Sequence, residues 1–189
     1  MKNAQQTAPA LQAGHTEQAA PAAQSDLLTD KLSDKAVVVY PGEGETLTLA
    51  GNSCVFKVTS AHSNSQLGVY EMILQPQTIG ASLHYHRYTD ETFIVTRGVL
   101  TIQLGGKNTE IPAGGVVYVP RYTPHSFSNQ SNEETQLMLV FNPSHQREGF
   151  FHGLFRILGE QPVDAEKFLR LYDRYDSIPV NPAGALPVK

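Results

Sequence analysis

Short runs of strand-forming residues dominate the sequence between residues 36 and 142, and turn residues separate them. The runs are rich in Val, Ile, Thr, Tyr and Phe, whereas Gly, Pro, Asn and Asp fill the gaps. Many short strands without helical patterns between them predict an all-β domain, either an antiparallel sandwich or a barrel. The predicted strands are 36–40, 46–49, 54–59, 67–74, 83–88, 92–96, 100–104, 116–119, 124–128 and 136–141.

The segments on either side of this β-rich region have other patterns. Residues 1–35 form a tail and lead-in rich in Ala and Gln, which we expect to be disordered because it has few large apolar residues to bury. Residues 143–189 contain apolar residues at helical spacing, which predict two short helices followed by an extended tail. The 189 residues are therefore expected to hold one β-domain, at 36–142, and a helical C-terminal segment.

The composition narrows the classes of function. Lys and Arg number 14 against 18 Asp and Glu, and the net charge of −4 argues against a nucleic-acid partner. The single cysteine, Cys54, excludes an intrachain disulfide and a Cys₄ zinc site. No apolar run is long enough to cross a membrane or to form the core of a secretion signal. We therefore expect no membrane partner and a cytoplasmic protein, with the seven histidines as candidate metal ligands.

Three histidines and one glutamate have the spacing of a metal site. His84 and His86 are two residues apart, so on a strand their imidazoles point to the same face. Residues 87–90 can form a turn, and Glu91 then begins the next strand beside the histidines. His125 lies well downstream, after a turn that contains two prolines.

Three neutral imidazoles and one carboxylate would hold one divalent transition metal ion and leave two neighbouring coordination positions open. Fe, Mn, Ni, Co, Cu and Zn all suit these ligands, and without a thiolate nothing separates them. The alternative is that the two close histidines are edge residues of a strand and the glutamate lies in solvent, but the combination favours the metal site. The remaining histidines are assigned to the surface or to packing: His15, His62, His145 and His152.

Both histidine segments resemble the two motifs of the cupin superfamily. The first motif is H-x-H followed by Glu and Gly, and the second runs from Gly through Pro to His and Asn. Tyr122 departs from the pattern, because the family has Gly at this position and a non-Gly residue with positive φ is uncommon. The matching residues are His84, His86, Glu91 and Gly98 in the first motif, and Gly114, Pro120, His125 and Asn129 in the second.

This resemblance implies a fold, a metal site and a substrate pocket. Cupins are double-stranded β-helices, or jelly-roll barrels, that hold the metal inside one end, and many form homodimers. Inward-facing residues near the metal would line the pocket, although each of them could equally be ordinary barrel core. Most are apolar or aromatic, which suits a planar, largely apolar ligand better than a free sugar. On the expected strand phases they are Tyr70, Met72, Ser82, Phe93, Val95, Tyr118, Phe127, Met138 and Val140.

The C-terminal segment is similar to the helical tail of bacterial quercetinase-like single-domain cupins. The similarity implies a quercetin 2,3-dioxygenase-like, metal-dependent oxygenase that acts on a small flavonol- or catechol-type substrate. Glu91 would be the catalytic base as well as a ligand, since it would remove the proton of a substrate hydroxyl. Phe150, Phe151 and Phe155 would form part of a lid. Two alternatives stay open: a metal-dependent cyclase or isomerase, and a non-catalytic cupin that binds a small molecule.

Overall fold

The computed structural model describes residues 36–186 of the chain. The predicted tail, residues 1–35, lies outside the described residues. Strands make up most of the described part, as the sequence predicts. They are β1 (Thr46–Leu49), β2 (Asn52–Val58), β3 (Gly68–Leu74), β4 (Thr78–Tyr85), β5 (Asp90–Arg97), β6 (Val99–Leu104), β7 (Lys107–Pro112), β8 (Val116–Val119), β9 (His125–Asn129), β10 (Thr135–Asn142) and β11 (Ile178–Pro179).

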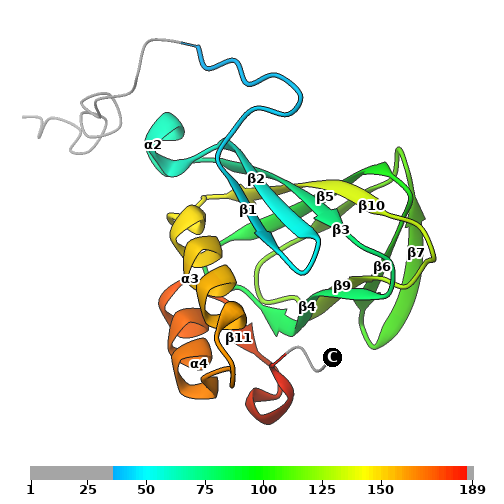
Figure 1. Ribbon diagram of the computed structural model, residues 1–189, viewed down its shortest axis with the longest axis vertical. Helices are drawn as coiled ribbons and strands as arrows, with labels where there is room; N and C mark the ends of the chain where they lie inside the picture. The colour runs from blue at the N-terminus through cyan, green and yellow to red at the C-terminus, as the bar shows by residue number, and fades with distance from the viewer. Residues whose placement is uncertain (1–35, 187–189) are drawn as a thin grey trace, which may run out of the picture. The chain divides into compact units, whose positions relative to one another are not determined.

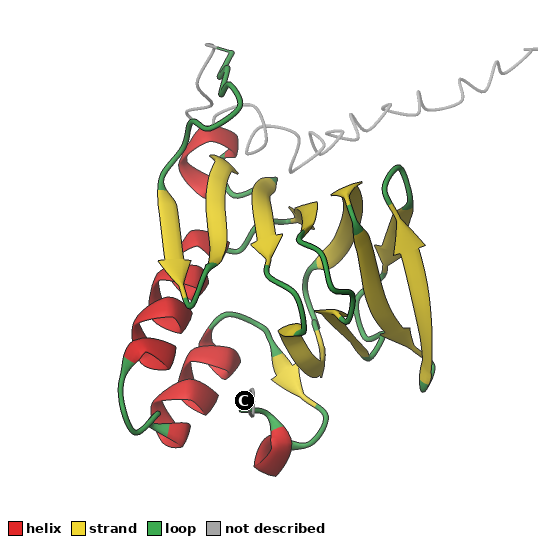
Figure 2. Cartoon of the chain, turned by 45° about the vertical axis from the view of Figure 1, so that its right-hand side comes forward, coloured by secondary structure: helices red, strands yellow, loops and turns green. Residues whose placement is uncertain are grey.

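The strands form two antiparallel sheets that face each other (Figure 1, Figure 2). The larger sheet has the order β1-β2-β3-β10-β5-β8, and the smaller has the order β11-β4-β9-β6-β7. Strands that are distant in the sequence therefore lie side by side, as β3 and β10 do. This arrangement of two antiparallel sheets confirms the predicted jelly-roll barrel.

Alternating burial explains how the larger sheet presents side chains to the interior. Every second residue of β3 and β10 is buried, because one face of this sheet packs inside the barrel and the other faces outward. In β5, Glu91, Phe93 and Val95 are the buried residues, in agreement with the predicted phase of this strand. Glu91 lies opposite Val119 of β8 and Phe141 of β10, so a carboxylate enters the interior among apolar side chains.

Two C-terminal helices pack against the barrel, as predicted. Helix α3 (Arg147–Gly159) contacts β1, and it lies beside α4 (Ala165–Arg174). Gly153 has no side chain where α3 meets Leu171 of α4, and a Cβ there would collide with the leucine. The remaining helical elements are short: α2 (Ser60–Ser63) and the 3₁₀ turn η1 (Pro182–Gly184). None of the helices within residues 36–186 is long and apolar enough to cross a membrane.

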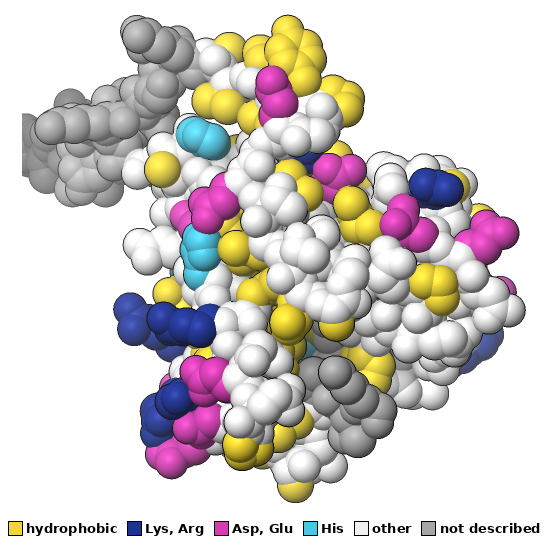
Figure 3. Space-filling model, in the orientation of Figure 1, with side chains coloured by type: hydrophobic (Ala, Val, Ile, Leu, Met, Phe, Trp, Pro, Cys, Tyr) yellow, Lys and Arg dark blue, Asp and Glu magenta, His cyan; other side chains and the backbone are white. Residues whose placement is uncertain are grey.

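Helix α4 is amphipathic and has a defined start. The carboxylate of Asp164 accepts hydrogen bonds from the backbone N–H groups of Glu166 and Lys167, both at 3.0 Å, and so caps the first turn. Phe168 and Tyr172 are buried on the inner face. Acidic and basic side chains gather on the surface over the helices (Figure 3). Lys167 of α4 forms an exposed ion pair with Glu160. The apolar face therefore attaches this helix to the molecule.

Two segments differ from the predicted strands. Residues 36–40 form no strand and are mostly exposed, because no neighbouring strand pairs with them. Strand β7, which the sequence analysis did not predict, is polar and exposed along most of its length. It is an edge strand held by pairing with β6, so backbone hydrogen bonds rather than apolar side chains define it.

Candidate metal centre

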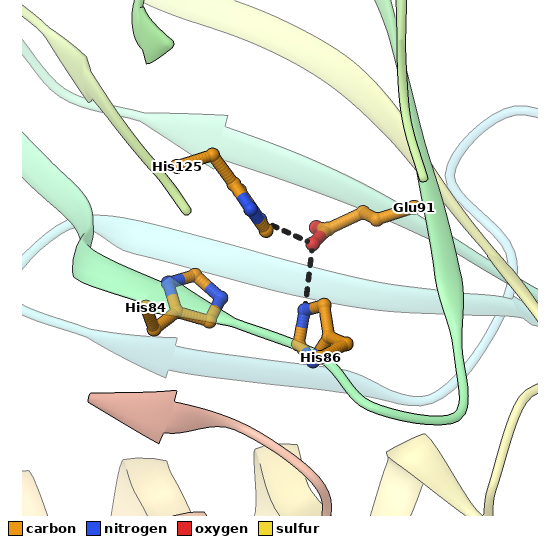
Figure 4. Close-up of side chains that lie close together, drawn as sticks. All are labelled: His84, His86, Glu91 and His125. Atoms are coloured by element: carbon orange, nitrogen blue, oxygen red, sulfur yellow. Dashed lines mark hydrogen bonds and ion pairs between the residues drawn. The ribbon is translucent and has the colours of Figure 1, made fainter. Parts of the chain in front are cut away.

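The four predicted ligand residues meet inside the barrel (Figure 4). His84 lies near the end of β4 and His86 just beyond it, Glu91 is the second residue of β5, and His125 begins β9. Each side chain is buried, and one ligand atom from each lies within 4.8 Å of the other three. Pairing of β4 with β9 places His84 directly opposite His125. The fold thus brings together residues that are more than forty positions apart in the sequence.

Backbone carbonyl groups orient all three imidazole rings. Each Nδ1 atom makes a hydrogen bond to a carbonyl oxygen, and a carbonyl oxygen can only accept. Nδ1 therefore carries the ring hydrogen, which leaves Nε2 as the available ligand atom in the neutral ring. The acceptors are the carbonyl oxygens of Ser82 for His84 (2.8 Å), of Thr123 for His125 (2.9 Å) and of Asp176 for His86.

The ligand residues shift one another's pKa values. Burial by itself would raise the pKa of Glu91, but His125 and His86 donate hydrogen bonds to its carboxylate when their Nε2 atoms are protonated, and this holds its pKa well below its usual range. Burial lowers the pKa of His84, and the neighbouring His125 and His86 lower it further. Glu91 is therefore ionised and His84 neutral near pH 7, and these are the protonation states that metal ligands require.

The arrangement of donor atoms fits a divalent cation. Nε2 of His86 and Nε2 of His125 each lie 3.0 Å from the same oxygen, Oε2 of Glu91 (Figure 4). With the ring hydrogens on Nδ1, two nitrogen lone pairs face a carboxylate oxygen, and they repel it unless a cation or a proton lies between them. A set of three imidazoles and one carboxylate suits divalent transition ions without selecting one of them.

Asp176 supports the site from the C-terminal segment, and the sequence analysis missed it. Its carbonyl oxygen accepts the Nδ1 hydrogen bond of His86. Its carboxylate accepts hydrogen bonds from the backbone N–H groups of Arg87 (3.0 Å) and Tyr88 (2.8 Å), in the turn between two ligand residues. Asp176 therefore holds both the ring of His86 and the turn that follows it. No local pattern marks this residue, because its partners lie about ninety positions earlier.

Tyr122 occupies the position at which the cupin motif has Gly, and its backbone is left-handed, with φ of 65°. Its N–H group donates a hydrogen bond of 2.6 Å to the carbonyl oxygen of His86. The second motif therefore keeps the turn that leads to His125 even without glycine, and this turn is tied to the first motif.

A small cavity of about 30 Å³ adjoins His84 and Glu91. This volume holds roughly two water molecules. Residues of α3 and α4 form its outer wall, so the two helices cap the metal end of the barrel, and we call them the helical cap. The cap contributes Arg147, Phe150, Phe151, Leu154 and Tyr172 to the cavity wall.

The predicted pocket residues do not all reach this cavity. Met72 and Phe127 line it, whereas Tyr70, Phe93 and Val95 are buried in the core outside its lining. Ser82 contributes its carbonyl oxygen to the orientation of His84. Of the predicted lid residues, Phe150 and Phe151 line the cavity, while Phe155 packs against the core elsewhere. Arg147 and Tyr172 line the cavity but were not predicted, although the aromatic run that follows Arg147 was visible in the sequence.

Three of the predicted inward positions were wrong. Tyr118 is 61% exposed, and Met138 and Val140 lie on the outer face of the larger sheet. Strands β8 and β10 are apolar on both faces, so the alternation of polar and apolar residues does not show which side chains face inward. In addition, β10 has a register shift at its start. The residues that face inward instead are Val119, Leu137, Leu139 and Phe141.

Residues 70–141 match the family model for the cupin domain. This segment of the chain is similar to the cupin domain. This match spans all four residues of the metal centre and confirms the resemblance seen in the two histidine motifs. A cupin domain with a buried His₃Glu group can bind a metal ion.

Comparisons with individual proteins agree with this assignment. The chain is 31% identical over 150 residues to quercetin 2,3-dioxygenase of Bacillus subtilis, a match that covers 76% of the chain but 42% of that protein. The chain therefore spans less than half the length of this curated relative. Two solved structures share the fold, each with a TM-score of 0.51 over 57% of this chain. One is named a predicted oxalate decarboxylase from Thermotoga maritima (21% identity, 99% of that chain), and the other is the polyketide cyclase RemF from Streptomyces resistomycificus (15% identity, 80% of that chain).

Proposed function

We propose that the protein is a metal-dependent oxygenase of the quercetin 2,3-dioxygenase type, which acts on a small, largely apolar substrate with an acidic enol or phenol hydroxyl. The observation that carries this proposal is the buried group of His84, His86, Glu91 and His125 beside a cavity walled by aromatic side chains. The similarity to a quercetin 2,3-dioxygenase over most of the chain supports the same chemistry.

Glu91 is the base in this proposal. A divalent transition ion held by the four residues would supply Lewis acidity at the substrate hydroxyl and redox chemistry with dioxygen. Glu91 is ionised inside the barrel and would accept the hydroxyl proton, while His86 and His125 keep its carboxylate oriented. Phe150 and Phe151 of the cap would exclude water and lie against a planar substrate.

Substrate entry requires movement of the helical cap. The cavity volume of about 30 Å³ is far too small for a flavonol. A larger surface groove of about 530 Å³ runs between α3 and the start of β4, where Leu158 and Ile79 line it. These residues are neighbours of Leu154 and Gly80, which line the small cavity. A displacement of α3 away from β4 would join the groove to the cavity, and this is the proposed route of entry.

Oxygen consumption tests the proposal directly. Protein loaded with Fe, Mn, Ni or Co is mixed with flavonols and catechols, and oxygen uptake is followed with an electrode. We expect uptake with at least one metal, and a loss of roughly 10²–10⁴-fold in Glu91→Gln because the base is removed. His152→Ala is the matched control, since this exposed histidine pairs with Glu45 and lies outside the cavity wall.

The same experiment separates the alternatives. Absence of oxygen uptake with every metal and substrate would overturn the oxygenase proposal. Product formation under strictly anaerobic conditions would favour a cyclase or isomerase. Ligand binding by the metal-loaded protein without turnover would favour a non-catalytic cupin.

We also propose that two copies of the chain form a homodimer through the outer face of the larger sheet. Val116 and Tyr118 are each 61% exposed there. Across the neighbouring strands, Val116 is in line with Ile94 and Met138, and Tyr118 is in line with Thr92 and Val140, which gives a largely apolar face. A second copy could bury this face by presenting the same face, as two-fold symmetry requires. The cytoplasmic location stays a prediction from the sequence.

A further inference from the structure

Arg147 is a buried cation in the wall of the cavity beside the metal centre. Its side chain is only 5% exposed, and it comes from the first residue of α3. Nη1 donates to the carbonyl oxygen of Tyr175 (2.8 Å), and Nη2 donates to Oγ of Ser177 (2.9 Å). Both acceptors are uncharged, and Arg147 forms no ion pair with a carboxylate of the described residues. Its positive charge is therefore held in place without being neutralised by direct contact.

Aromatic rings surround the guanidinium group. The guanidinium carbon lies 4.1 Å from the ring centre of Phe150 and 4.4 Å from that of Phe141. These cation–π contacts stabilise the position of the group. They do not balance its charge, and the ionised Glu91 in the same cavity wall acts on it only at a distance, without a direct ion pair. The surroundings of Arg147 are thus suited to an additional anion.

One donor of Arg147 lacks an acceptor. Its Nε atom is the only buried side-chain nitrogen or oxygen of residues 36–186 without a hydrogen-bond partner. Native proteins pair nearly all such groups. The side chain of Arg147 lines the cavity, so an acceptor atom that enters the cavity could pair with this donor. Tyr172 also lines the cavity and carries a hydroxyl group.

The charges in the cavity wall favour an anion. Glu91 is the only carboxylate among the residues that line the cavity. A divalent ion at the metal centre together with Arg147 would leave this space with an excess of positive charge. The apolar side chains of Met72, Phe127 and Phe151 make up much of the remaining wall. The cavity therefore combines attraction for one negative group with contacts for an apolar body.

We propose that Arg147 is a positioning residue that selects an anionic substrate, a small organic anion whose carboxylate or ionised enol oxygen accepts from Nε while its apolar body lies against the phenylalanine rings. The proposal rests on the proposed function, since it places this substrate beside the metal centre. It adds that the negative charge of the substrate is recognised by the helical cap and not by the metal centre alone.

Matched pairs of anionic and neutral ligands test this selection. Calorimetric titration compares acetate with acetamide and benzoate with benzamide, on metal-loaded and on metal-stripped protein. We expect the wild-type protein to bind each carboxylate roughly tenfold more tightly than its amide, the preference that one charge-assisted hydrogen bond gives. Arg147→Met should bring the ratio close to one in metal-stripped protein and lower it in metal-loaded protein, where the metal ion itself still favours the carboxylate. Arg97→Met, which removes an exposed arginine outside the cavity wall, should leave the ratio unchanged.

The ratio separates recognition from a structural role. If Arg147 only held the cap on the barrel, its loss would weaken the acid and the amide equally and leave their ratio unchanged, which would overturn the proposal. If Arg147→Met fails to fold, Arg147→Gln is the second variant, because its side chain can still donate to the Tyr175 carbonyl. A lowered acid-to-amide ratio would again support the proposal, and an unchanged ratio would overturn it. No preference for the carboxylate in wild-type protein, or no binding of either, would also overturn it.

Metal content measured on the same samples distinguishes this proposal from the proposed function. Protein that contains no metal but shows a preference dependent on Arg147 would contradict the oxygenase and retain the anion selection. Protein that consumes oxygen but shows no preference for the carboxylate would support the oxygenase and contradict the anion selection.

Discussion

Tyr122 has a backbone conformation that is unfavourable for any residue with a Cβ atom. An L-residue in the left-handed region loses roughly 1–2 kcal/mol relative to a relaxed backbone, and Tyr122 has φ of 65° with its side chain 63% exposed. We expect Tyr122→Gly to raise the free energy of unfolding by about 1 kcal/mol, measured by urea denaturation.

Tyr40→Gly is the control for this prediction. Tyr40 is 64% exposed, lies in a loop and is not among the residues with positive φ. Its replacement by glycine should lower stability slightly because it adds unfolded-state entropy. Equal effects of the two substitutions would show that backbone strain at Tyr122 is not the cause.

His84 should be indispensable for metal binding. Its Nδ1 hydrogen bond to the Ser82 carbonyl points Nε2 into a buried group with no spare histidine nearby among the described residues. We expect His84→Ala to reduce metal affinity roughly 100-fold or more, a larger loss than removal of a supporting residue causes. Metal content after purification without added metal measures this. Full retention of metal by the variant would refute the assignment, and His152→Ala should behave as wild type.

At the scale of elements, the approach of β4 to β9 depends on a glycine. A Cβ atom at Gly80 would collide with the ring of Phe127, which lines the cavity. We expect Gly80→Ala to lower the free energy of unfolding by about 2 kcal/mol, because an aromatic ring in a packed interior cannot move aside freely. Thermal or urea denaturation measures the change.

A second substitution identifies the cause. In Gly80→Ala combined with Phe127→Leu, the smaller side chain makes room, so the double variant should be less destabilised than the sum of the single variants. Gly159→Ala at the end of α3 is the control, since a Cβ there makes only an ordinary contact with Leu49. Strict additivity of the two changes would contradict the predicted collision.

At the scale of the whole molecule, metal binding should stabilise the fold. The ligands come from three regions of the barrel that separate on unfolding, so an ion that binds only the folded chain adds to stability. At a free metal concentration of 100 times the dissociation constant, the gain is about 2.7 kcal/mol. For a chain of this size we expect a chelator to lower the melting temperature by roughly 5–10 °C. In His84→Ala the chelator should lower the melting temperature by no more than about 2 °C, and an equal drop in the variant would point to another metal site.

The proposed homodimer can be tested separately from the metal. Tyr118→Lys places a charge on the exposed apolar face of the larger sheet, where burial against a second copy would be unfavourable. We expect light scattering after gel filtration to give the mass of two chains for the wild type and of one chain for the variant. Lys167→Ala, on the charged face of α4, should leave the mass unchanged. A monomeric wild-type protein would exclude the dimer.

The β-rich architecture, the two C-terminal helices and the four candidate metal ligands could be predicted from the sequence. Each of these follows from local rules: short apolar runs bounded by turn residues, helical spacing, and the i, i+2 geometry that puts His84 and His86 on one face. The phases of β8 and β10 did not follow from such rules, because both faces of these strands are apolar. Only pairing with β5 decides which side chains enter the barrel.

The contributions of the helical cap could not be predicted from the sequence, because they depend on contacts between distant segments. Asp176 reaches His86 across 90 positions, and Arg147 loses its solvent only because the cap closes over the barrel. Sequence patterns indicate which residues of a segment are buried and which are exposed. They do not indicate which distant segment the buried residues contact. A buried charge beside a metal centre is produced by such contacts, and therefore it became visible only in the folded molecule.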